Sequence, residues 1–294
     1  MTIESAYQRT SQEASGAVEE EYWSSLTNTK DSILIPDLNL LYQRVPKVAG
    51  TTISKILLHL LFNDPEGKAI GNANVHYVIG TLLPLLSDYP KKYVYEKFTS
   101  KDTFKFTFVR NPYAKLVSCY KDKIQRLQDI RTTVNEATSI AEAMETKQPH
   151  FYEEPKYILY NAKMRAAVGK EPYTPYSPKF EVATFEEFAR FICDQKNEEM
   201  EHHWEPQTVT TNWGKVDYTH IGKQESFIDD MTHVLAALGA SSYLYQMLPE
   251  KLNMTKRTQT MQSYYPPALQ ELVYNRFLGD FQAFGYSPEL PSGL

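Results

Sequence analysis

The chain has 294 residues, 42% of them hydrophobic and 13% aromatic, which is enough apolar material for one large globular domain or two small ones. Its formal net charge of −5 argues against a nucleic-acid partner and against a long polyanionic acceptor, since both require a broad basic surface. With only Cys119 and Cys193 available, the sequence predicts no disulfide framework.

The N-terminal segment is polar. Residues 1–30 are rich in Ser, Thr and Glu, and we expect a flexible arm there, followed by a single domain over residues 31–294. Tyr22 and Trp23 could instead dock on the domain surface or close over a site. The N-terminus has no charged region followed by an apolar run, so we do not expect a signal peptide. No stretch reaches the roughly 18 apolar residues of a membrane span. We therefore expect a soluble, cytoplasmic protein, or else a piece of a membrane-anchored protein that lacks its anchor.

Residues 40–61 predict a strand, a tight loop and a helix. An apolar run over residues 40–42 enters the loop, and the helix follows with apolar residues at helical spacing: Ile53, Ile56, Leu57, Leu60 and Leu61. The loop holds Lys47, Gly50, Thr51 and Thr52 where the helix begins, and there free N–H groups and the positive end of the helix dipole attract phosphate or sulfate. The two threonines could equally be N-caps of an ordinary turn.

Residues 103–109 predict a second strand, because phenylalanine occupies every other position. Arg110 follows this strand, at the edge where open α/β sheets bind ligands. Pro112 suits the first turn of a following helix, which carries Ser118. The first loop lacks the spacing of a nucleoside-triphosphate P-loop, since Lys47 precedes the glycine instead of following it.

The two motifs, residues 46–52 and 109–120, resemble the nucleotide motifs of the sulfotransferases. The likeness is greatest to the carbohydrate branch that includes the chondroitin and dermatan enzymes. Asn111 and Lys115 depart from the aspartate and arginine of many relatives without contradicting the phosphate role. Further signatures follow in the family's order at residues 184–188, 203–207, 218–225 and 284–286.

The resemblance implies an α/β, P-loop-like sulfotransferase fold, with a central, mostly parallel sheet flanked by helices. It implies 3′-phosphoadenosine-5′-phosphosulfate (PAPS) as sulfate donor, adenosine 3′,5′-bisphosphate (PAP) as product, and no metal. Arg110 and Ser118 match the residues that bind the 3′-phosphate, and Arg257 is a candidate for a further nucleotide contact. The residues that match the 5′-phosphosulfate motif are Lys47, Val48, Ala49, Gly50, Thr51 and Thr52.

Catalysis by such an enzyme requires a general base, because an alcohol that keeps its proton is a poor nucleophile at pH 7. Lys47 would neutralise the bridging oxygen as the S–O bond breaks. In related heparan-type enzymes a residue between the two motifs is the base, so His76 is the candidate, and His203 is held in reserve. Either histidine could instead be structural. The adjacent His202 and His203 do not predict a metal site, because side chains of neighbouring residues are expected to point apart.

The acceptor is less well defined by the sequence. Residues 149–180 are rich in Tyr and Pro and predict no regular element; their tyrosines could pack on the core or stack on a sugar. The predicted function is in-line transfer of a sulfuryl group from PAPS to a hydroxyl, or an amine, of a saccharide or small metabolite. The alternatives are a P-loop-type kinase or NTPase and a non-catalytic nucleotide- or glycan-binding relative. The oligomeric state is not predicted.

Overall fold

The computed structural model describes residues 20–26, 29, 32–63, 81–128, 154–173, 177, 179–246, 248 and 260–291. The chain divides into two compact units, which are described in turn. The first unit comprises Met1–Val109 and Gln207–Leu252, and the second comprises Arg110–Pro206 and Asn253–Leu294.

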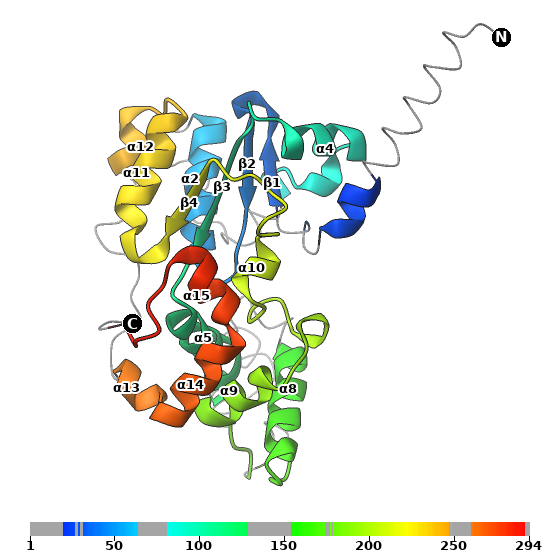
Figure 1. The fold of residues 1–294 in the computed structure, drawn as a ribbon, viewed down its shortest axis with the longest axis vertical. Coiled ribbons are helices and arrows are strands. Elements are labelled where there is room, and N and C mark those ends of the chain that lie inside the picture. Colours follow the sequence, from blue (N-terminus) through cyan, green and yellow to red (C-terminus); the bar gives the residue numbers. More distant parts are fainter. Residues whose placement is uncertain are drawn as a thin grey trace, which may run out of the picture. The chain divides into compact units, whose positions relative to one another are not determined.

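The first unit is built on a four-stranded sheet in the order β1–β2–β3–β4 (Figure 1). β1 (Ser32–Ile35) runs antiparallel to β2 (Leu40–Gln43). β2, β3 (Phe104–Val109) and β4 (His220–Lys223) are mutually parallel. The predicted α/β class with a mostly parallel sheet is therefore confirmed, and β3 lies where the alternating phenylalanines placed it.

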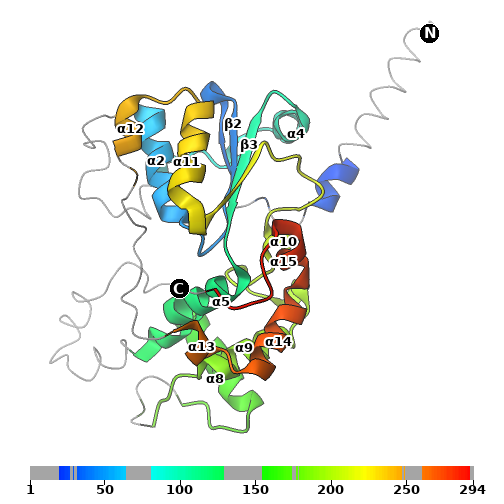
Figure 2. The ribbon, with the colours of Figure 1, turned by 60° about the vertical axis from the view of Figure 1, so that its left-hand side comes forward.

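Helices cover both faces of this sheet (Figures 1 and 2). α2 (Gly50–Phe62), α11 (Phe227–Ala237) and α12 (Ser242–Gln246) share one hydrophobic cluster with the sheet, in which the rings of Tyr42 and Phe106 stack with centroids 4.7 Å apart. A second cluster contains α4 (Lys91–Thr99) and the helical residues 20–25. Shorter helices are η1 (Pro36–Leu38), η2 (Leu86–Asp88), α10 (Gln207–Thr210) and η6 (Gln224–Ser226).

The polar N-terminal segment is docked where the structure describes it. The rings of Tyr22 and Trp23 lie edge-on to Phe98 of α4, with centroids 6.4 and 6.0 Å away. The Tyr22 hydroxyl also donates to the backbone oxygen of Lys215. Docking of the two aromatic residues, one of the alternatives left open by the sequence, is what the structure shows.

The second unit is helical. Its largest fully buried side chain is Trp204, which is met edge-on by the rings of Tyr157, Tyr160 and Phe188. The helices are α5 (Pro112–Tyr120), the π-helical turn η3 (Lys121–Gln125), α8 (Glu154–Ala167), α9 (Phe185–Cys193), η5 (Asn197–Glu199), α13 (Met261–Tyr264), α14 (Pro267–Arg276) and α15 (Leu278–Phe284).

The expectation of no regular element over residues 149–180 is wrong for α8. Tyr157, Tyr160 and Met164 recur at positions i, i+3 and i+7, and this spacing turns all three toward the core of the unit. Tyr157 and Tyr160 therefore pack in the core instead of lining a sugar wall. Tyr152 and Tyr176 lie outside the described residues.

None of the helices in the described parts of the chain is both long enough and apolar enough to cross a membrane.

Gly222 allows β4 to pack beside β3. It pairs with Phe108 in the parallel register, and a Cβ added at Gly222 would lie 2.5 Å from a ring carbon of Phe108, well inside contact distance. The Phe108 ring is fully buried, so it has little space into which to move.

We therefore expect Gly222→Ala to lower the free energy of unfolding by about 1–3 kcal/mol, as overpacking of a core does. Chemical denaturation followed by circular dichroism measures the loss. Phe108→Leu is the partner variant: combined with Gly222→Ala, it should lose less than the sum of the two single losses. Strict additivity would show that the clash with Phe108 is not the cause.

Candidate anion-binding site

The loop between β2 and α2 has an unusual backbone. Lys47 and Ala49 have positive φ angles of 66° and 50°, although neither is glycine, and Val48 between them does not share this conformation. Left-handed backbone is unfavourable for residues with a Cβ, and it persists where the surrounding structure enforces it, often at ligand sites. Alternation of this kind turns successive N–H groups toward one concavity, which is how backbone nests hold anions.

α2 begins in this loop without a side-chain cap. Its N-cap is Ala49, and the first intrahelical bond runs from the Ile53 N–H to the Ala49 carbonyl, 3.0 Å away. The N–H groups of Gly50, Thr51 and Thr52 precede that bond, at the positive end of the helix dipole. The alternative in which the threonines are N-caps is wrong, because they lie within the first turn and not ahead of it.

Arg44 adds a cation to the same loop. Its Nε atom would lie 3.2 Å from a Cβ built on Gly50, so the arginine side chain runs along the open face of that glycine. Lys47 and Arg44 are both half-buried. The sequence gives no signal for Arg44 at this site, because only the folded turn of the loop brings it against a residue six positions later.

The backbone of this loop yields a test. Ala49→Gly should relieve left-handed strain of about 1–2 kcal/mol, partly offset by about 0.5–1 kcal/mol of glycine entropy. We expect a small rise in thermal stability, measured by scanning calorimetry. Ala114→Gly in α5 is the matched control and should lower stability, since Ala114 lies within a helix. Equal losses in both variants would contradict the left-handed conformation at Ala49.

The second motif begins the second unit. Arg110 directly follows β3, and Asn111 is the N-cap of α5: its side-chain oxygen accepts from the N–H groups of Tyr113 (3.0 Å) and Ala114 (3.4 Å). Pro112 occupies the first turn, as predicted. The Asn-Pro pair is a recognisable capping signal, in which Asn111 caps the helix and Pro112 occupies its first turn.

Ser118 is the one residue of α5 that is not buried. Its hydroxyl has no hydrogen-bond partner among the described residues, so it is available to a ligand. One turn later, Lys121 lies in the π-helical turn η3 with its ammonium 5.4 Å from the ring centroid of Tyr264. Burial and then the nearby charge of Arg110 lower the pKa of Lys121. Two cations thus repel each other in this unit, and a bound phosphate would relieve that repulsion.

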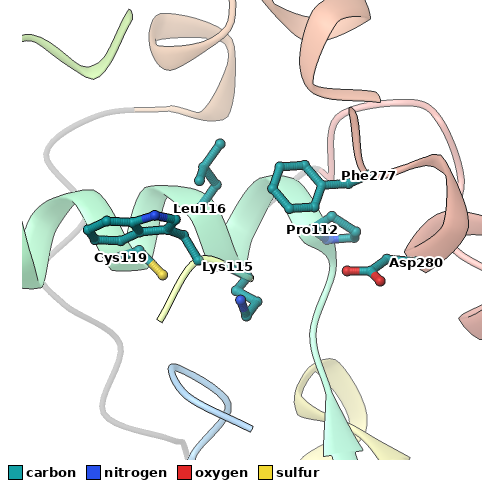
Figure 3. A pocket seen from close by; sticks show the side chains of 7 residues that line it. Pro112, Lys115, Leu116, Cys119, Phe277 and Asp280 are labelled. Atoms are coloured by element: carbon teal, nitrogen blue, oxygen red, sulfur yellow. The ribbon is translucent and has the colours of Figure 1, made fainter. Parts of the chain in front are cut away.

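The opposite side of α5 is closed. A crevice along it is lined by both buried charged and apolar side chains, and it leaves no room for a water molecule. Figure 3 shows Phe277 and Asp280 beside Pro112, at the N-terminal end of the helix. The lining residues are Pro112, Lys115, Leu116, Cys119, Trp204, Phe277 and Asp280. Because Asn111 already accepts from the first N–H groups of α5, an anion would be bound by side chains of this helix and not by its N-terminus.

A third group of polar residues lies in the turn that follows η5. The Glu201 carboxylate accepts hydrogen bonds from Nδ1 of His202 (2.8 Å) and from Nδ1 of His203 (2.9 Å). The expectation that the two histidine side chains point apart is wrong, because residues 202–204 form a turn that brings both rings to one carboxylate. Their potential metal-ligand atoms lie within 4.8 Å of one another. The Lys156 ammonium, 2.7 Å from the same carboxylate, already supplies a cation there.

The remaining predicted residues are placed as follows. Lys47, Val48, Ala49, Gly50, Thr51 and Thr52 all lie in the loop or the first turn of α2 in the first unit, and Arg110 and Ser118 lie in the second. His76 and Arg257 lie outside the described residues. Their roles stay predictions.

An α/β sheet followed by a helix that begins without a side-chain cap, as in the first unit, is an arrangement by which proteins bind phosphate or sulfate groups. A family model described as "Sulfotransferase family" matches residues 30–287, so the chain belongs to the sulfotransferase family.

Curated relatives agree with this assignment. Carbohydrate sulfotransferase 14 of Danio rerio is 26% identical over 86% of the chain and 62% of its own length. Carbohydrate sulfotransferase 11 of Rattus norvegicus is 25% identical over 88% of the chain and 67% of its own length. Carbohydrate sulfotransferase 10 of Rattus norvegicus is 25% identical over 92% and 72%. The chain thus spans about two thirds of the length of these relatives. No solved structure matches it.

Proposed function

We propose that the protein transfers a sulfuryl group from PAPS to a hydroxyl of a saccharide acceptor. The observation that carries the proposal is the uncapped N-terminus of α2, which opens into a loop with left-handed Lys47 and Ala49. Membership of the sulfotransferase family supports the reaction. The names of the relatives, all carbohydrate sulfotransferases, support a saccharide over the small metabolite that the acidic composition favoured.

The residues present suit the two anionic ends of PAPS, which supplies an activated sulfuryl group and leaves PAP. The N–H groups at the start of α2 would hold the 5′-phosphosulfate, and Gly50 lets the backbone approach it closely. Arg110 offers a planar fork that matches the 3′-phosphate, and Ser118 adds one hydrogen bond. Arg257 would add a further contact. None of these roles calls for a metal ion.

Catalysis then depends on position and charge, as it does in phosphoryl transfer. Lys47 would neutralise the negative charge that develops on the bridging oxygen, and Arg44 beside Gly50 strengthens the positive field of the loop. A base must take the proton of the acceptor hydroxyl, and the sequence offers His76, with His203 in reserve. A cytoplasmic location stays a prediction.

Nucleotide binding gives the first test. Isothermal titration with PAP should show micromolar affinity, and ADP and ATP should bind more weakly because they lack the 3′-phosphate. Arg110→Ala should weaken PAP binding about 10- to 100-fold, the effect of losing hydrogen bonds to a charged group. Arg190→Ala on α9, where Arg190 pairs with Glu186 at the surface, is the matched control. Equal or tighter binding of ATP would favour a kinase or NTPase and contradict the proposal.

Transfer itself gives the second test. Lys47→Ala should lower turnover by about 100-fold or more, the effect of removing a group that stabilises transition-state charge. The assay follows radiolabelled sulfate from PAPS to pooled saccharides. Lys55→Ala, an exposed lysine of α2, should keep normal turnover. Near-normal turnover of Lys47→Ala would contradict the role of Lys47.

A further inference from the structure

The turn after η5 contains a buried carboxylate that is unusually rich in donors. Glu201 is almost fully buried in the second unit. Besides the two imidazoles, it accepts from the His203 backbone N–H at 2.9 Å and from the Lys156 ammonium at 2.7 Å. The Tyr157 hydroxyl lies 3.4 Å from it. Burial alone would raise the pKa of Glu201, but the hydrogen bonds from His202 and His203 outweigh it and hold that pKa far below its usual range. The carboxylate is therefore ionised.

An ionised carboxylate fixes the tautomer of the imidazole beside it. Glu201 can only accept, so Nδ1 of His203, 2.9 Å away, must carry the proton between them. Among the described residues, every hydrogen bond of the His203 ring is made at Nδ1, including that with the Tyr157 hydroxyl at 3.2 Å. Nε2 of the neutral ring then carries a lone pair and no described partner.

The surroundings keep this ring neutral. Burial, helped by the charges of His202 and Lys123, outweighs the raising effect of Glu201 and lowers the pKa of His203 to about 4. Two further lysines contact this turn: Lys156 is bound to Glu201, and Lys115 is bound to the backbone oxygen of His203. At neutral pH the ring is therefore in the form that can accept a proton.

The backbone of His203 is attached to the helix that carries Ser118. Its carbonyl oxygen accepts from Nζ of Lys115 and from Sγ of Cys119, both at 2.9 Å. Lys115 also donates to the carbonyl of Glu205, 2.9 Å away. Figure 3 shows Lys115 and Cys119 on α5. Two successive turns of α5 thus hold the histidine at a fixed place in the second unit, whose Arg110 and Ser118 are the proposed 3′-phosphate contacts.

We propose that His203 is the general base of the transfer reaction and that Glu201 is its positioning residue, an inference that rests on the sulfotransferase function proposed above. Nε2 of His203 takes the proton of the acceptor hydroxyl while the acceptor oxygen forms its bond to sulfur. The bond between sulfur and the bridging oxygen breaks, and its electron pair stays on the departing phosphate. Glu201 stabilises the imidazolium, which then returns its proton to water.

A metal site is the competing interpretation of the same three residues. It is disfavoured by charge, because Lys156 already pairs with Glu201 and the charge of Lys123 acts on the ring. The two interpretations differ in what they require of His202. A metal would need both histidines, whereas a base needs only His203, since His202 supplies one of several donors to the carboxylate.

The first experiment compares histidine variants in the transfer assay. His203→Asn should lower turnover by about 100-fold or more, within the range for loss of a general base, and should change PAP affinity less than twofold. His233→Asn, which removes an exposed histidine of α11, should be unaffected. Normal turnover of His203→Asn together with an inactive His76→Asn would overturn the proposal. Equal losses of turnover in His202→Asn and His203→Asn would also overturn it, because a metal site needs both histidines and a base needs only His203.

A second experiment needs no acceptor. Nitrogen NMR of histidine-labelled protein at pH 7 should show His203 neutral, protonated at Nδ1, and titrating only below about pH 5. Glu201→Gln should remove the preference for Nδ1. A ring that is charged at pH 7, or protonated at Nε2, cannot act as proposed and would overturn the inference. If the unmodified protein does not bind PAP, the sulfotransferase function is contradicted instead. The NMR result would then still describe the interaction of Glu201 with His203.

Discussion

A helix that begins without a side-chain cap leaves its first N–H groups to be satisfied by something outside the helix, and α2 begins in this way. The conformation of the loop between β2 and α2 is consistent with that constraint. The left-handed backbone at Lys47 and Ala49 directs the chain so that the loop opens toward the helix end. Gly50 has no side chain to obstruct it, and Arg44 lies alongside. In the second unit, α5 satisfies its first N–H groups with the side chain of Asn111 and is therefore closed at its N-terminus.

Net charge gives a poor picture of this chemistry. The chain is acidic overall, yet its candidate ligand groups are cationic or donor-rich: the loop with Lys47, and Arg110 followed by Lys121. Local fields depend on the nearest charges and on burial more than on the sum over the chain. The same holds in the opposite sense for Glu201, a carboxylate that is stabilised in the interior because donors surround it.

The sequence predicted the elements that have a strong period. β3 follows the alternating phenylalanines, and α2 and α5 follow their apolar stripes, because burial of one face determines these elements. The N-cap at Ala49 could not be predicted, since a left-handed alanine leaves no compositional signal and depends on the whole loop. α8 was not predicted, because the many Tyr and Pro residues around it obscure the helical spacing of Tyr157, Tyr160 and Met164. The meeting of His202 and His203 at one carboxylate depends on a turn that spacing rules for helices do not describe.

The enclosure of α5 has an evolutionary consequence. Every residue of this helix except Ser118 is part of the packed interior, so a change at almost any position disturbs the core before it alters ligand contacts. Such a helix has little freedom to drift, and selection for a new donor would be opposed by selection for folding. Residues near the surface of the second unit are free of this restriction. A lineage built on this scaffold can thus diversify in what it modifies while the helix that carries Ser118 stays the same.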